Sequence, residues 1–255
     1  MPLPFSLLLF SDLACKVPSL APGTLETISC ILLAGDITIG AKSENSIKRC
    51  FKKVALQLPE DMPVYFIPGN HDHPYVCNQH EWLPSNFTLM HGRWEEIQVG
   101  ISKGSEKNTR APEVILIGFG GASMGLYNNF AFEEEEIESR LSGLFKQVQE
   151  ARDGSDGFII LLVHDPPRNT ALDVNYRGDH VGSIAIRRVI ERFQPDLAVA
   201  GHIHESPGID IIGKTTCVNA GEARYGFHAL LHVDDTGGIH ADFMENKKAV
   251  LKENK

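Results

Sequence analysis

The chain has 255 residues, of which 42% are hydrophobic and 22% charged, proportions typical of a soluble globular protein. Its net charge is -9 at pH 7, so the molecule as a whole has no positive field that would attract nucleic acid or an anionic membrane. We therefore expect neither partner. If the protein handles phosphates, the positive charge must be local, and a bound metal ion is an economical source.

Short apolar runs recur along the chain, several of them ending in turn residues. Near-continuous apolar runs of this length are typical of strands buried on both faces. The first run has no basic segment before it and Asp12 follows at once, which favours a strand over a signal peptide. No run approaches the roughly 18 apolar residues of a membrane helix. The predicted strands are Phe5–Phe10, Cys30–Ala34, Val64–Ile67, Val114–Ile117, Phe158–Val163 and Leu197–Ala200.

Helices are predicted between these strands. The stretch Ser43–Leu58 places its apolar residues on one face, and Ser183–Phe193 does the same with Ser183 as the expected N-cap and Pro195 as the stop. The stretch Glu133–Arg152 begins with four glutamates and ends in a basic residue, which suits the helix dipole. Helices that alternate with buried strands predict an α/β fold.

The last third of the chain changes to short strands with Gly-rich turns, which we expect to form one antiparallel meander. No composition shift divides the chain, so we predict a single domain over residues 1–244 and a charged, fraying tail over residues 245–255. A polar loop is expected at Lys103–Pro112. The predicted C-terminal strands are Ile209–Ile212, Thr215–Val218, Ala229–Val233 and Ile239–Phe243.

The chain has five cysteines, an odd number. They are scattered along the sequence, and no two of them have the CxxC spacing. This usage predicts unpaired thiols in a reducing compartment, so a cytoplasmic location is expected. The cysteines are Cys15, Cys30, Cys50, Cys77 and Cys217.

Polar residues able to bind a metal stand just after five of the predicted strands. In open α/β sheets, ligands bind beyond the carboxyl ends of the strands, and Asp, Asn and His suit borderline divalent metals such as manganese, iron or zinc. Taken singly, an Asp in such a place is more often a turn or capping residue, and a lone His is more often buried in a core. Their joint occurrence predicts a metal site. The residues are Asp12, Asp36, Asn70, His71, Asp72, His164, His202 and His204.

The order of these motifs resembles the calcineurin-like metallophosphoesterase superfamily, in particular its small prokaryotic members with one domain. The resemblance runs from about residue 6 to about residue 221 and rests on "SDL", "AGDI", "PGNHD", "VHD" and "GHIH". It implies an α/β fold that is a four-layer α/β/β/α sandwich with two mixed central sheets. It also implies two divalent metal ions, with manganese as the first expectation and iron, zinc, nickel or magnesium as alternatives.

The resemblance assigns a role to each position. Asp36 would bridge the two ions, Asp12 and His204 would bind the first, and His71 would face the substrate and protonate the leaving oxygen. Asp72 would orient His71. The second ion would be bound by Asn70, His164 and His202.

One position departs from the pattern. The family's first motif is usually Asp-x-His, whereas this chain has Ala14, whose methyl group cannot bind a metal. The first metal site should therefore be weakened and partly occupied, although three protein ligands are enough for a catalytic site. The neighbouring Cys15 is a minor candidate for the missing ligand. Substrate range is the other property that this change puts in doubt.

The expected function is hydrolysis of a small phosphodiester or phosphomonoester by metal-bound hydroxide, with His71 as acid and electrostatic stabiliser. Two alternatives stay open. One is a non-catalytic scaffold on the same fold, as in a retromer subunit, although the retained His71 argues against it. The other is a nuclease of the DNA-repair branch, against which the acidic charge argues. The sequence does not predict the oligomeric state.

Overall fold

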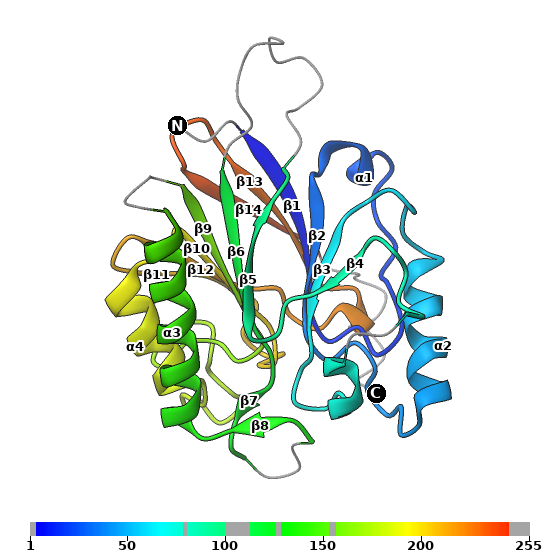
Figure 1. Cartoon of the computed structure of the whole chain (residues 1–255), viewed down its shortest axis with the longest axis horizontal. Coiled ribbons are helices and arrows are strands. Elements are labelled where there is room, and N and C mark those ends of the chain that lie inside the picture. Colours follow the sequence, from blue (N-terminus) through cyan, green and yellow to red (C-terminus); the bar gives the residue numbers. More distant parts are fainter. Residues whose placement is uncertain (1–3, 79–80, 100–112, 126–128, 153–156, 245–255) are drawn as a thin grey trace.

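The computed structural model describes residues 4–78, 81–99, 113–125, 129–152 and 157–244, and it is built around two six-stranded sheets (Figure 1). Both sheets are mixed, with parallel strands at the centre and antiparallel strands toward an edge. The order in the first sheet is β14 (Ile239–Met244), β13 (His228–Val233), β1 (Phe5–Phe10), β2 (Cys30–Ala34), β3 (Val64–Ile67) and β4 (Phe87–Leu89). The order in the second is β11 (Gly208–Ile212), β12 (Thr215–Asn219), β10 (Leu197–Ala200), β9 (Phe158–Val163), β6 (Val114–Phe119) and β5 (Arg93–Ile97).

Helices cover the outer face of each sheet. Helix α2 (Glu44–Ala55) lies on the first sheet, and α3 (Glu134–Arg152) and α4 (Ile184–Phe193) lie on the second, at opposite sides of the molecule in Figure 1. The shorter elements are α1 (Thr24–Thr27), the 3-10 turns η1 (Pro74–Cys77) and η2 (Ala223–Tyr225), and the strand pair β7 (Ala122–Ser123) and β8 (Ala131–Phe132). The predicted N-cap of α4 is confirmed, because the Ser183 hydroxyl accepts a hydrogen bond from the amide of Ile186 at 3.1 Å.

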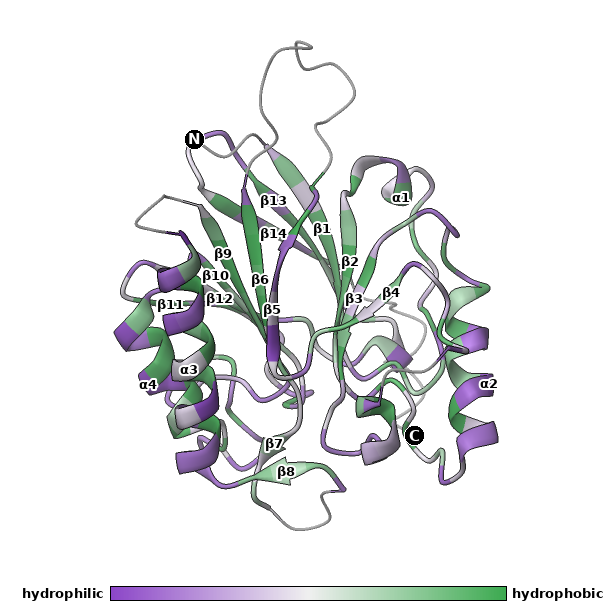
Figure 2. Ribbon diagram, in the orientation of Figure 1, coloured by the Kyte–Doolittle hydropathy of each residue, from purple (hydrophilic) through white to green (hydrophobic). Residues whose placement is uncertain are grey.

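The central strands are buried on both faces, which explains their near-continuous apolar runs. Successive side chains of a strand point to opposite faces. In β1, Leu7 and Leu9 therefore pack between the two sheets, while Leu8 and Phe10 pack toward α2. Figure 2 shows the strands as mainly hydrophobic and the helices as hydrophilic on much of their surface. The expected four-layer α/β/β/α sandwich is confirmed.

The predicted C-terminal meander is wrong. Strands β11 and β12 form an antiparallel pair in the second sheet, where β12 runs parallel to β10. Strands β13 and β14 form another antiparallel pair in the first sheet, where β13 pairs with β1. Turn residues reveal a hairpin, but they do not reveal which sheet edge the hairpin joins, because that depends on contacts distant in sequence.

The six strands predicted from the N-terminal and central runs match β1, β2, β3, β6, β9 and β10, with β6 two residues longer than predicted. Strands β4, β5, β7 and β8 were not predicted. The polar loop expected at Lys103–Pro112 and the tail at 245–255 lie outside the described residues, and the division into one domain and a tail stays a prediction. Among the helices that the structure describes, none is both long and apolar enough to cross a membrane.

A partly buried histidine lies in an aromatic cluster beside β6. The ring of His91 stacks on Phe132 at 5.8 Å between centroids, and its Nδ1 accepts a hydrogen bond from the amide of Gly120 at 2.9 Å. Burial, together with the charge of Arg140, lowers the pKa of His91 to about 4. The folded protein therefore holds this ring neutral at a pH where the unfolded chain would protonate it.

We predict that the free energy of unfolding falls as the pH is lowered from about 6.5 toward 4, because only the unfolded chain binds a proton at His91 in this window. The substitution His91→Asn keeps an acceptor for the Gly120 amide and removes the titration. In this variant, the free energy of unfolding should decrease between pH 7 and pH 5 by about 1–2 kcal/mol less than in the natural protein. Urea unfolding at pH 7, 6 and 5 measures this, and an equal pH dependence in both proteins would contradict it.

Candidate metal centre

The ends of strands from both sheets meet at one place. Asp12 follows β1 and Asp36 follows β2 in the first sheet, whereas His164 follows β9 in the second. Ligand atoms of these three buried side chains lie within 4.8 Å of one another. The expected convergence beyond the carboxyl ends of the strands is therefore present for them, and it joins residues from two different sheets.

The turns that carry the centre have unusual backbone conformations. Asp12, Asp36 and His202 have φ values of 56°, 54° and 64°, a left-handed region that is sparsely populated by residues other than glycine. Such conformations cost free energy and persist where the surroundings hold them, often at functional sites. At Gly35, with φ of 97°, an added Cβ would lie 2.5 Å from Nδ1 of His164, so only glycine allows this approach.

Asp12 is fully buried and its two carboxylate oxygens have different surroundings. Oδ2 accepts hydrogen bonds from the Ser11 hydroxyl at 2.5 Å and from the amide of His202 at 3.1 Å. Oδ1 lies 2.9 Å from Nε2 of His204, but this contact does not have hydrogen-bond geometry, so Oδ1 has no hydrogen-bond partner. Burial opposes the ionised form, yet the neighbouring His204 and His164 hold the pKa of Asp12 well below its usual value.

Asp36 has the opposite electrostatic situation. It is 1% exposed, and its Oδ1 accepts a hydrogen bond from the amide of His71 at 2.8 Å. Burial, followed by repulsion from Asp12 and Asp72, raises the pKa of Asp36 well above its usual value. A cation placed between the two carboxylates would remove this conflict, because it stabilises both in the ionised form.

The histidine from β9 is oriented for a ligand on its Nε2 side. Nδ1 of His164 lies 2.6 Å from the carbonyl oxygen of Ala34 and donates a hydrogen bond to it, which turns Nε2 toward the centre. That Nε2 lies 2.9 Å from Oδ1 of Asn70 and 3.8 Å from Oδ2 of Asp36. All three atoms are of kinds that bind divalent metal ions.

The remaining predicted ligands lie close by. The ring of His202 is 5.0 Å from that of His164, and burial, reinforced by His164, lowers the pKa of His202 to about 3, so the ring is neutral. Buried carboxylates, an amide oxygen and neutral imidazoles form a donor set for a divalent metal ion. These residues fit the metal that the sequence predicts.

Comparison with known proteins agrees with this geometry. The model of the calcineurin-like phosphoesterase family matches residues 9–206. The chain belongs to that family. The uncharacterized protein MJ1162 of Methanocaldococcus jannaschii is 30% identical over 220 residues, which is 84% of this chain and 87% of the relative.

Solved structures show the same fold at low sequence identity. The protein TT1561 of Thermus thermophilus superposes with a TM-score of 0.62 at 16% identity, covering 93% of this chain and 98% of that one. A dimetal phosphatase from Danio rerio gives a TM-score of 0.58 at 12% identity, covering 92% and 94%. The phosphoesterase described here is thus a metal-dependent phosphoester hydrolase by family, and the predicted class is confirmed at that level.

The carboxylate of Asp72 in this phosphoesterase contacts backbone of the neighbouring loops, and its expected role in orienting His71 stays a prediction. Its Oδ1 accepts hydrogen bonds from the amide and hydroxyl of Thr38 at 2.7 and 2.6 Å, and its Oδ2 accepts from the amides of Ile37 and Gly69 at 3.1 and 2.9 Å. These four bonds use the lone-pair sites of the carboxylate. Asp72 therefore joins the loops after β2 and β3. Partial burial lowers the pKa of His71, and the nearby charge of Asp72 opposes this shift.

His204 lies between two carboxylates, one of which the sequence analysis missed. Its Nε2 faces Asp12, and its Nδ1 lies 3.0 Å from Oε2 of Glu222. Burial opposes a charge here, but the two carboxylates raise the pKa of His204 to about 10. An acidic residue in a turn is ordinarily exposed, so Glu222, which is 6% exposed, gave no local signal of its position.

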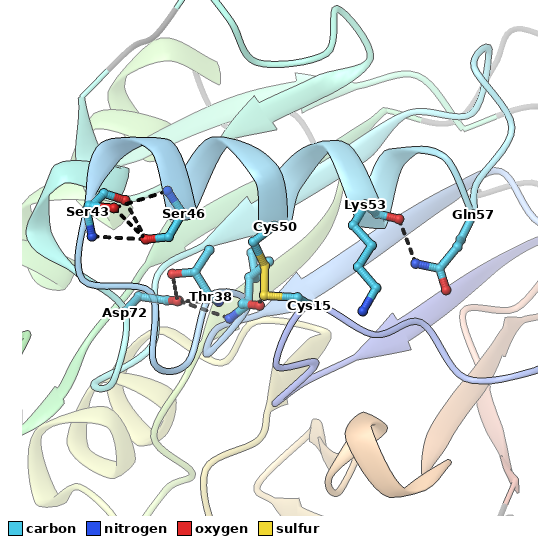
Figure 3. The surroundings of a disulfide bond; sticks show 9 residues. Cys15, Thr38, Ser43, Ser46, Cys50, Lys53, Gln57 and Asp72 are labelled. Atoms are coloured by element: carbon cyan, nitrogen blue, oxygen red, sulfur yellow. Dashed lines mark hydrogen bonds between the residues drawn. A yellow bond between two sulfur atoms is a disulfide. The ribbon is translucent and has the colours of Figure 1, made fainter.

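The expectation of unpaired thiols is wrong for two of the five cysteines. Cys15 and Cys50 form a disulfide with 4.9 Å between their Cα atoms, which ties the loop after Asp12 to helix α2 (Figure 3). Cys30, Cys77 and Cys217 are free. Because Cys15 Sγ is bonded to Cys50, it is not available to replace the ligand missing at Ala14. Sequence spacing gave no sign of this pair, since the two cysteines are 35 residues apart.

We predict that the double substitution Cys15→Ser and Cys50→Ser lowers the free energy of unfolding by about 2–4 kcal/mol, because the bond restricts the unfolded chain over a long loop. Chemical unfolding under oxidising conditions measures the loss. A dithiol reductant should reproduce it in the natural protein and leave the double variant unchanged. A natural protein insensitive to the reductant would contradict the prediction.

Proposed function

We propose that this chain hydrolyses small phosphoesters at a dinuclear centre in which Asp36 lies between two divalent ions. The observation that carries the proposal is the convergence of ligand atoms from Asp12, Asp36 and His164 within 4.8 Å, in a buried site whose carboxylates repel each other. The fold shared with a Danio rerio protein described as a dimetal phosphatase supports the same conclusion.

The ligand set divides around Asp36. Asp12 and His204 would hold the first ion, and Asn70, His164 and His202 would hold the second. Divalent ions bound there would lower the pKa of bound water. They would also offset the negative charge of the phosphoryl group. Manganese is our first expectation, because the carboxylate and amide oxygens of the set suit it.

The protein's own residues position and protonate the substrate. The amide of His71 is bonded to Asp36, which places this exposed residue at the edge of the centre. Its ring would contact the phosphoryl oxygens and donate a proton to the leaving oxygen. The carbonyl of His71 accepts a hydrogen bond from Nδ2 of Asn129 at 3.2 Å, which further holds this turn.

We predict that His71→Ala lowers kcat by about 10²–10⁴-fold, the usual range for loss of a general acid, and leaves the metal content unchanged because His71 is not a ligand. The assay uses an aryl phosphomonoester and a bis-aryl phosphodiester with added Mn²⁺, with elemental analysis of both proteins. A variant as active as the natural protein on both esters would remove His71 from the mechanism.

The same assay separates the rival functions. Bound metal without turnover of any phosphoester would favour a non-catalytic scaffold on this fold. Turnover restricted to DNA would favour a nuclease, which the net charge of -9 argues against. Failure to bind any divalent ion would reject the metal-dependent hydrolase.

The effect of Ala14 can be measured directly. We predict that Ala14→His tightens the weaker Mn²⁺ site by at least about 10-fold, the scale on which even outer-shell groups affect metal affinity. Ala14 has φ of 44°, a conformation in which histidine is one of the better tolerated residues. Ala14→Phe is the matched control, since it adds a ring without a donor. Equal Mn²⁺ affinity in the His and Phe variants would show that position 14 does not face the ion.

A further inference from the structure

Glu222 is a buried carboxylate beside the proposed centre to which the ligand assignment gives no role. Its Oε2 lies 3.0 Å from Nδ1 of His204, on the side of the ring opposite to the contact between Nε2 and Asp12. The imidazole therefore has one carboxylate on its ligand side and another behind it.

The segment that carries Glu222 is attached to both loops that carry the first metal's ligands. In η2, the amide of Ala223 donates to the carbonyl of Ser11 at 2.9 Å, and that of Arg224 donates to the carbonyl of Asp12 at 3.1 Å. The side chain of Asn219 donates to the carbonyl of Ile203, within the loop of His204, at 2.8 Å. The position of Glu222 relative to His204 is thus set by the same contacts that place Asp12.

A counter-charge makes the burial of Glu222 tolerable. Nη2 of Arg224 lies 2.5 Å from its Oε1, and the guanidinium lies over the ring of Tyr225 at 4.8 Å. A buried charge is stabilised when it is paired. The resulting series, Asp12, His204, Glu222 and Arg224, alternates in sign from the centre to the surface.

We propose that Glu222 is the positioning residue of His204, and that it supports the ion at the site that has no ligand from position 14. It would accept a hydrogen bond from the Nδ1–H of His204, which would direct the Nε2 lone pair toward the ion beside Asp12 and make that nitrogen a stronger ligand. Carboxylates behind a metal-binding histidine commonly act in this way. The inference rests on the proposed function, since it requires a metal at Asp12 and His204.

The test is titration of the metal-free protein with Mn²⁺, in which the step lost in His204→Ala identifies the first site. Glu222→Ala should weaken that step by about 10–100-fold. Glu222→Gln, whose amide oxygen can still accept a hydrogen bond from the Nδ1–H of His204, should recover part of the loss. Glu205→Gln is the matched control, because it removes the same charge one residue from His204 at an exposed side chain, and it should bind Mn²⁺ like the natural protein.

The outcomes separate this inference from the function on which it rests. First-site affinities of both Glu222 variants equal to that of the natural protein would overturn the inference and leave the proposed function intact. A natural protein that binds no divalent ion would overturn both. If Glu222→Ala does not fold, as judged by circular dichroism, Glu222→Gln decides: a weakened first site with an unchanged second site supports the inference, and unchanged affinity overturns it.

Discussion

Two carboxylates buried in one site are the constraint on which the functional part of this molecule depends. Asp12 and Asp36 are both almost inaccessible to water, and burial, followed by repulsion from Asp12, raises the pKa of Asp36. The neighbouring carboxylates of Asp12 and Glu222 raise the pKa of His204 to about 10, although burial opposes its charge. The arrangement is therefore suited to a positive ion, and the imidazoles of His202 and His164 complete a donor set for one.

Backbone hydrogen bonds between loops keep the two carboxylates close together despite their repulsion. The turns after β1 and β2 are linked by hydrogen bonds from the amides of Asp12 and Ala14 to carbonyls at Gly35 and Asp36. The carboxylate of Asp72 then binds the loops after β2 and β3 together, and the disulfide fastens the loop after Asp12 to α2. Each of these contacts joins segments that are separate in sequence. The strained turns are therefore maintained by the stability of the folded sandwich as a whole.

The ligand assignment, the number of ions and the role of Glu222 form one consistent proposal. An ion beside Ala14 would have fewer protein ligands than its neighbour, and a carboxylate behind His204 would offset part of that loss. This division also agrees with the acidic net charge of the protein, since the positive charge that a phosphoester requires would be local to the centre.

The sequence patterns predicted strand bounds correctly where a strand is buried on both faces of its sheet. Strands such as Phe158–Val163 were predicted with correct bounds, because residues that are apolar on both faces form a run that ends where the chain leaves the sheet. Strand β5, Arg93–Ile97, was missed because it lies at an edge and carries charged residues that remain partly accessible. The C-terminal hairpins were recognised as strands, but their assignment to a single meander failed because pairing partners lie far away in sequence.

By itself, the sequence determined the class of the site: the identity and order of residues such as Asp12, Asp36 and His164, each after a strand, specify donors for a divalent metal. It also determined the absence of an imidazole at Ala14. Only the tertiary structure decided how side chains behind these residues are used, namely Asp72 as a link between loops, Glu222 behind His204, and Cys15 bonded to Cys50. The physical reason is that a strand end is a local property of the chain, whereas hydrogen bonds and ion pairs between loops depend on how two sheets are placed against each other.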